Sequence, residues 1–164
     1  MTPFDHTPET WFAEIAGRKT QLTRGGSGPP LVYLHGALGE SDWFPFIDRL
    51  AAKHTVFLPA HPGFATSEGL ESIDNMQDLA WHYVDMFSSL GLSKVPIVGF
   101  SLGGWLAMQI AILRPDLVGP LTLVCPAGIR IAEHPFAELF VDDFDHMRRL
   151  LFYDPKDPMV DQTI

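Results

Sequence analysis

The fold of this chain is decided by the stretch Val95-Pro96-Ile97-Val98-Gly99-Phe100-Ser101-Leu102-Gly103-Gly104-Trp105. A short apolar, β-branched run ends in the pattern Gly-x-Ser-x-Gly, and a helix-like apolar pattern begins directly after it. Glycine and serine alone are common turn residues, but here they stand between a predicted strand and a predicted helix. The stretch therefore predicts a strand, a sharp turn and a helix, with Ser101 at the turn.

Two glycines, Gly99 and Gly103, stand two residues before and two residues after Ser101. In a nucleophile elbow the serine takes a strained backbone conformation at the top of the turn. Residues two before and two after the serine then come close to its Cβ, so only very small side chains fit there. The glycines meet this requirement, and Ser101 becomes a candidate nucleophile.

Composition and charge limit the classes of protein to consider. A chain of 164 residues with 46% apolar and 19% charged residues has the composition of one globular domain. The formal net charge of −9 argues against nucleic acid and anionic membranes as partners, because both would repel the chain. A solvated acidic surface is the simpler explanation for this charge.

The single cysteine gives no sign of a disulfide, and the N-terminal residues give no sign of a targeting segment. One cysteine, Cys125, excludes an intrachain disulfide, and its place after an apolar run predicts a small buried residue. Residues 1–11 include Asp5 and Glu9 and no apolar stretch, so we expect neither a signal peptide nor a transmembrane segment there. The expected location is cytoplasmic.

Hydrophobic periodicity predicts an alternation of strands and helices. Short apolar runs predict buried strands, and apolar residues at helical spacing predict helices between them. An antiparallel hairpin is expected first, followed by a mostly parallel, doubly wound α/β sheet with helices on both faces. The expected strands are 11–15, 18–23, 31–34, 55–58, 96–100 and 121–124, and the expected helices are 42–53, 74–90 and 102–113.

Several details of these elements can be predicted as well. The helix at 42–53 is expected to have Ser41 or Asp42 as its N-cap, with Pro45 in its first turn. The helix at 102–113 is apolar almost all round, which predicts burial against the sheet. The strand at 121–124 has the apolar character of a buried strand.

The pattern changes after residue 128. Apolar residues then recur every three or four positions among charged ones, which predicts an amphipathic helix with no strand after it. The apolar stripe consists of Phe136, Phe140, Phe144, Met147 and Leu151. Core packing explains such a stripe better than a binding surface does. We expect residues 1–131 to form one part of the chain and residues 132–164 another.

Three motifs, each following a predicted buried strand, carry a family resemblance. They are His35-Gly36, Pro62-Gly63-Phe64 and Gly99-Phe100-Ser101-Leu102-Gly103-Gly104. In this order and on these elements they resemble the α/β-hydrolase superfamily, and within it the single-domain esterases and carbon-carbon bond hydrolases. The resemblance covers roughly residues 10–130 as an incomplete hydrolase core. Residues 132–164 are similar to the start of the helical cap that such enzymes insert.

The resemblance implies roles for individual residues. Ser101 would be the nucleophile, and the backbone N–H groups of Leu102 and Ala37 would form the oxyanion hole. Gly36 would let the backbone approach the substrate. His35 would order the loop beside the oxyanion site rather than act as the base. His61 is expected to be a solvated loop residue.

The other members of a catalytic triad are not evident. In this fold the acid and then the histidine follow the serine, on separate strand ends. Residues 125–128 hold no carboxylate, and Asp143 or Asp145 with His146 lie too near each other in one helix to serve. Two explanations remain open: an N-terminal portion of a longer hydrolase, which alone would be inactive, or a complete module without catalysis.

The predicted chemistry is acyl transfer from a carboxylic ester to water, with carbon-carbon bond hydrolysis as an alternative. A serine nucleophile disfavours the dehalogenase and epoxide hydrolase reactions that the family performs through an aspartyl ester. The partner would be a small, apolar carbonyl compound, and no cofactor or metal is expected because His and acidic residues show no ligand spacing. A non-catalytic binding or interaction module is the competing hypothesis. The sequence leaves a homo-oligomer open.

Overall fold

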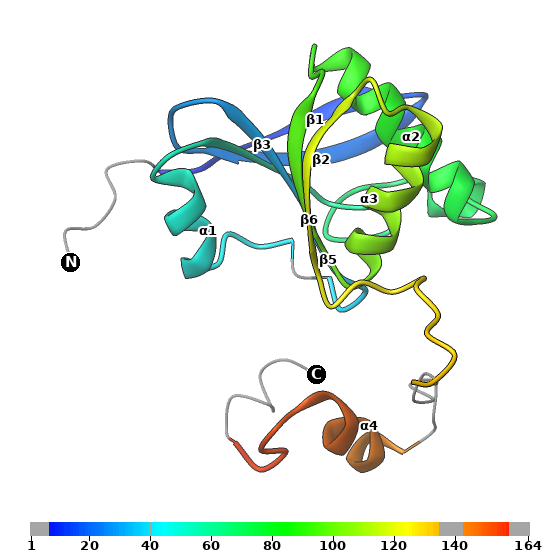
Figure 1. The fold of residues 1–164 in the computed structure, drawn as a ribbon. Coiled ribbons are helices and arrows are strands. Elements are labelled where there is room, and N and C mark those ends of the chain that lie inside the picture. The colour runs from blue at the N-terminus through cyan, green and yellow to red at the C-terminus, as the bar shows by residue number, and fades with distance from the viewer. Residues whose placement is uncertain (1–6, 40, 135–142, 158–164) are drawn as a thin grey trace. The chain divides into compact units, whose positions relative to one another are not determined.

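A six-stranded sheet forms the centre of the larger of two compact units in the computed structural model of the chain (Figure 1). The structure describes residues 7–39, 41–134 and 143–157. The first unit spans Met1–Gly128 and the second Ile129–Ile164.

The sheet combines an antiparallel hairpin with parallel strands, as the sequence predicts. The strand order is β1-β2-β4-β3-β5-β6. β1 pairs with β2 and β2 with β4 in antiparallel fashion, while β3 pairs in parallel with β4 and β5, and β5 with β6. The strands are β1 (Glu9–Ile15), β2 (Arg18–Gly25), β3 (Pro30–Leu34), β4 (Thr55–Pro59), β5 (Val95–Phe100) and β6 (Val118–Val124).

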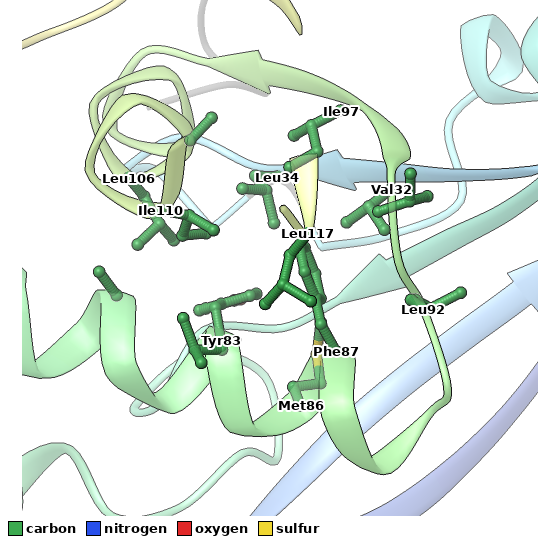
Figure 2. Packing of buried hydrophobic residues seen from close by; sticks show 14 of the residues in the cluster. Val32, Leu34, Tyr83, Met86, Phe87, Leu92, Ile97, Leu106, Ile110 and Leu117 are labelled. Atoms are coloured by element: carbon green, nitrogen blue, oxygen red, sulfur yellow. The ribbon is translucent and has the colours of Figure 1, made fainter. Parts of the chain in front are cut away.

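Helices cover both faces of this sheet, which confirms the predicted doubly wound α/β architecture (Figure 1). On one face α1 (Pro45–Ala51) packs through Ile47 against Leu31, Val56 and Leu58. On the other face lie α2 (Met76–Ser89) and α3 (Leu102–Leu113). Figure 2 shows the larger core there, where side chains of the two helices and of the sheet meet: Val32, Leu34, Tyr83, Met86, Phe87, Ile97, Leu106 and Ile110.

The helix starts differ from prediction. α1 begins at Pro45 with Phe44 as N-cap and no side-chain cap, so the prediction of Ser41 or Asp42 as N-cap is wrong. Proline is suited to this first position because its missing N–H has no partner to lose and its φ is already helical. α2 begins at Met76, two residues after the predicted start, because the Asn75 side chain caps it.

The side of the sheet at β6 is more open than the sequence indicates. β6 is the last strand in the order, and Val124 at its end is 41% exposed. α3 buries one face only, and its Ile112 is 74% exposed. The predicted burial of this helix against the sheet is confirmed for the face that carries Leu106 and Ile110. The prediction of a buried strand at 121–124 is wrong, because its residues alternate between half-buried and exposed. Cys125, expected to be buried, is exposed.

The second unit contains α4 (Phe144–Leu151), which Asp143 caps by accepting a hydrogen bond from the Asp145 N–H. Of the predicted amphipathic stripe, Phe136 and Phe140 lie outside the described residues. The role of residues 132–164 as the start of a cap stays a prediction. A 3-10 turn, Leu70–Ser72, precedes α2 in the first unit. Across residues 7–39, 41–134 and 143–157, every helix is too short or too polar to cross a membrane.

Three buried histidines lie in the described part of the first unit: His35 after β3, His61 after β4 and His82 in α2. Burial, which disfavours the charged imidazolium, lowers the pKa of His35 and of His82 to about 4. Burial also lowers the pKa of His61 to about 3, assisted by the neighbouring His35. All three histidines are therefore neutral in the folded protein at neutral pH.

Replacement of one buried and one exposed isoleucine in α3 tests the packing. Ile110→Ala removes a fully buried side chain and should lower the free energy of unfolding by about 2 to 5 kcal/mol. Ile112→Ala, two residues away and exposed, should change it by less than about 0.5 kcal/mol. Urea denaturation followed by circular dichroism measures both. Equal losses in the two variants would contradict the burial of only one face.

Acidification should destabilise the fold because of the three buried histidines. Above pH 6.5 these groups are neutral in both states, so their contribution is complete. As the pH falls, the unfolded chain binds protons that the folded chain does not, so stability is lost from pH 6.5 down to about 4 for His35 and His82 and down to about 3 for His61. Each histidine should contribute a slope of up to about 1.4 kcal/mol per pH unit.

Urea denaturation between pH 6 and pH 5, where most carboxylates remain ionised, measures this slope. His82→Gln should reduce it, because the amide of glutamine does not titrate. A wild-type slope near zero would show that the buried histidines do not exclude protons.

Candidate active site

Ser101 sits at the junction of β5 and α3, where it is the N-cap of the helix. Its backbone has φ 51° and ψ −113°, in a region that non-glycine residues rarely occupy. Such strain costs of order 1 to 3 kcal/mol and persists only where the surroundings enforce it. The side chain is half-buried, and in the described part of the chain its hydroxyl makes no hydrogen bond. The strand, sharp turn and helix thus occur as predicted.

Backbone hydrogen bonds to the segment around the end of β6 hold the strained residue in place. The Ser101 N–H donates to the Val124 carbonyl at 3.0 Å, and the Ser101 carbonyl accepts from the Ala127 N–H at 3.0 Å. The same carbonyl accepts from the N–H groups of Gly104 and Trp105 in the first turn of α3. The turn is therefore fixed both to its own helix and to the neighbouring strand.

The glycines at 99 and 103 are required, although not for the predicted reason. A Cβ on Gly99 would lie 2.6 Å from the Gly103 carbonyl oxygen, and one on Gly103 would lie 2.6 Å from the His35 carbonyl oxygen. The closest obstacles are thus backbone atoms of α3 and of the end of β3, rather than the Cβ of Ser101. No side chain could be added at either position without moving main chain.

The same close approach brings the loop after β3 to the start of α3. β3 and β5 are parallel neighbours, with Leu34 opposite Gly99, so both strands end at the same edge of the sheet. Leu102 is the first residue of α3, where a backbone N–H has no partner within the helix. Ala37 is exposed in the loop that follows His35 and Gly36. The oxyanion role of these two N–H groups stays a prediction.

His35 and His61 hold the loops after β3 and β4 to each other. The His61 N–H donates to His35 Nε2 at 3.0 Å, so His35 carries its proton on Nδ1 and donates it to the Gly36 carbonyl at 2.7 Å. In return, His61 Nε2 donates to the His35 carbonyl at 2.9 Å. The two rings lie close together, with centroids 3.7 Å apart and planes tilted by 32°. The expectation of a solvated His61 is wrong, because His61 is 1% exposed.

Neither histidine is suited to take a proton from Ser101. Both ring nitrogens of each residue are already engaged in hydrogen bonds. Burial lowers the pKa of His35 to about 4 and that of His61 to about 3, well below the range of an effective base at neutral pH. The geometry of His35 suits the predicted loop-ordering role, which stays a prediction.

The other ionisable candidates lie in the second unit. Asp143 and Asp145 are the N-cap and first-turn residues of α4, and the exposed His146 follows directly. Their places along one short helix agree with the argument that they cannot occupy separate strand ends. Among the described residues no imidazole or carboxylate hydrogen-bonds to Ser101, and no group of three His, Cys, Asp or Glu side chains could hold a metal ion.

Comparison with known proteins places this geometry in a family. The family described as alpha/beta hydrolase fold matches residues 29–158. The 2-hydroxymuconate semialdehyde hydrolase of a Pseudomonas species is 31% identical over 148 residues, which is 83% of this chain and 51% of that protein. An uncharacterized protein from Mycobacterium tuberculosis is 33% identical over 124 residues, 74% of this chain and 36% of that protein.

A solved structure shows the same relationship. The naproxen esterase of Bacillus subtilis superposes with a TM-score of 0.69 at 28% identity, over 76% of this chain and 45% of the esterase chain. The chain thus spans about half or less of the length of the relatives it matches. With its six-stranded mixed sheet, its strained serine between β5 and α3 and the family match over residues 29–158, the chain belongs to the α/β-hydrolase fold family.

Proposed function

We propose that this chain carries the nucleophile of a serine hydrolase and that Ser101 is that nucleophile. The observation that carries the proposal is the backbone of Ser101, which is held in a strained conformation between β5 and α3. Strain of this kind concentrates at functional sites because it presents a side chain where an unstrained turn would not. Relatives in the family are hydrolases, including a naproxen esterase and a 2-hydroxymuconate semialdehyde hydrolase.

In the proposed reaction, Ser101 Oγ attacks the carbonyl carbon of the substrate while a base accepts the hydroxyl proton. The Leu102 and Ala37 N–H groups stabilise the negative charge that forms on the carbonyl oxygen. The N-terminus of α3 adds the positive end of its helix dipole at the same place. Collapse of the intermediate expels the alcohol and leaves an acyl-enzyme, which water then hydrolyses.

The base and the acid that orients it are proposed to come from the part of the relatives' length that this chain does not span. Support comes from the coverage of the relatives, which is 36% to 51%, and from the low pKa values of the two histidines near the elbow. The chain alone would then have the nucleophile and the oxyanion donors without an efficient proton acceptor.

A carboxylic ester is the proposed substrate class. An ester releases an alcohol, whose oxygen takes up one proton. Carbon-carbon bond cleavage releases a carbon leaving group, and this carbon must be protonated by a donor placed beside it. The exposed side chain of Leu38, next to the proposed Ala37 donor, favours an apolar substrate. Carbon-carbon bond hydrolysis is the second candidate, because the motifs also resemble the carbon-carbon bond hydrolases of the family and the Pseudomonas relative is a 2-hydroxymuconate semialdehyde hydrolase.

Covalent labelling with an alkyl fluorophosphonate tests the nucleophile. The adduct should form on Ser101, as located by peptide mass spectrometry, and should be absent from Ser101→Ala. Ser27→Ala, which changes an exposed serine in the loop between β2 and β3, should label like the wild type. The experiment is done on this chain and on the longest product of its coding sequence.

Labelling of Ser101→Ala at the wild-type rate would show that another residue reacts. Absence of an adduct in both polypeptides would reject the hydrolase proposal and support a non-catalytic binding or interaction module.

A further inference from the structure

The pair formed by His35 and His61 is held from a third element, α2. Tyr83 of α2 is completely buried, and its hydroxyl lies 2.5 Å from His61 Nδ1. Because His61 Nε2 faces a carbonyl oxygen, it must carry the proton, and a neutral His61 then has an acceptor at Nδ1. The Tyr83 hydroxyl is therefore the donor, and it fixes His61 in the tautomer with its proton on Nε2.

The tautomer of His61 decides how the chain after β3 is held. Its Nε2–H donates to the His35 carbonyl, the same carbonyl whose oxygen would lie 2.6 Å from a Cβ on Gly103. One peptide plane is thus fixed by an imidazole on one side and packed against the elbow on the other. The next residues along the chain are Gly36 and Ala37, and Ala37 supplies one of the two proposed oxyanion donors.

We propose that His61 is a positioning residue for catalysis: held in one tautomer by Tyr83, it orients the peptide after His35 and so aims the Ala37 N–H at the oxyanion site. This proposal rests on the hydrolase function proposed above. It assigns His61 no contact with the substrate, since both its ring nitrogens are occupied by protein groups. The proposal also gives Tyr83 an indirect role in the reaction, because Tyr83 bonds to His61 Nδ1 while the His35 carbonyl bonds to His61 Nε2.

The groups that face His61 keep it neutral. They are the His35 ring from the loop after β3, Tyr83 and His82 from α2, and the edge of Phe64 from its own loop. Burial and the nearby histidines oppose a positive charge on His61, and burial raises the pKa of Tyr83, which keeps its hydroxyl proton. The arrangement of donors is therefore the same across the neutral pH range.

Two substitutions of His61 by an amide residue distinguish a positioning role from a role in packing alone. Each amide can make one of the two hydrogen bonds that the imidazole makes. In His61→Gln the side-chain amide reaches the place of Nε2 and can still donate to the His35 carbonyl. In His61→Asn the amide reaches only the place of Nδ1, so it can still meet Tyr83 but not the carbonyl. Tyr83→Phe keeps the ring and removes the donor, while Tyr153→Phe, at a fully exposed position, is the matched control.

The first measurement is the rate of phosphonate labelling at Ser101 against phosphonate concentration. We expect the maximal rate to fall about 10- to 100-fold in His61→Asn, which removes the donor to the His35 carbonyl, because a misdirected Ala37 N–H no longer stabilises the transition state. In Tyr83→Phe, which keeps that donor but releases the other side of the ring, the rate should fall by less, though by more than about threefold. His61→Gln and Tyr153→Phe should stay within about threefold of the wild type, and the concentration for half-maximal rate should not change. Wild-type rates in His61→Asn and Tyr83→Phe, or an equal loss in His61→Gln, would overturn the proposal.

The second measurement does not depend on catalysis, so it separates failure of this proposal from failure of the hydrolase proposal. Amide 1H and 15N chemical shifts of Gly36 and Ala37 should move in His61→Asn and Tyr83→Phe, but not in His61→Gln or Tyr153→Phe. If the wild type does not label yet these shifts follow this pattern, the positioning contact stands and the proposed reaction fails. If the shifts are the same in all variants, His61 does not position the loop.

Discussion

The structure depends on one close approach of main chain to main chain, where Gly103 meets the carbonyl groups at the end of β3. The missing side chains at Gly99 and Gly103 let α3 start directly at the sheet edge, and that start forces Ser101 into its strained conformation. β3, β5 and β6 must end together for this to happen, which their parallel pairing ensures. The two cores on either side of the sheet then supply the stability that maintains the strain.

Much of this arrangement could be predicted because its signals are local. The Gly-x-Ser-x-Gly pattern and the alternation of apolar runs with helical periodicity each act over a few residues. These signals correctly predicted the hairpin, the order of strands and helices, and the serine at the turn. Helix ends were less predictable, since Phe44 and Pro45 start α1 through backbone geometry rather than through a capping side chain.

What could not be predicted depends on contacts between distant parts of the chain. His61 appears in the sequence as a histidine between Ala60 and Pro62 in a loop, and nothing nearby indicates that Tyr83 and the His35 carbonyl meet its two ring nitrogens. The exposure of Ile112 and Val124 follows from the position of β6 at the end of the strand order, which apolar character alone does not reveal.

The reciprocal bonds between His35 and His61 also bear on how this protein can change over evolutionary time. The side chain of His35 accepts from the backbone of the other loop, and the side chain of His61 donates to the backbone of the first. Replacing His35 by a residue without an acceptor, or His61 by one whose side chain cannot donate to the His35 carbonyl, leaves a buried polar group of the opposite loop without a partner, at a cost of about 1 to 3 kcal/mol. We therefore expect the loops after β3 and β4 to evolve together, with a substitution in one loop tolerated when the other loop changes as well. A chimaera that takes one of these loops from a relative should also take the other.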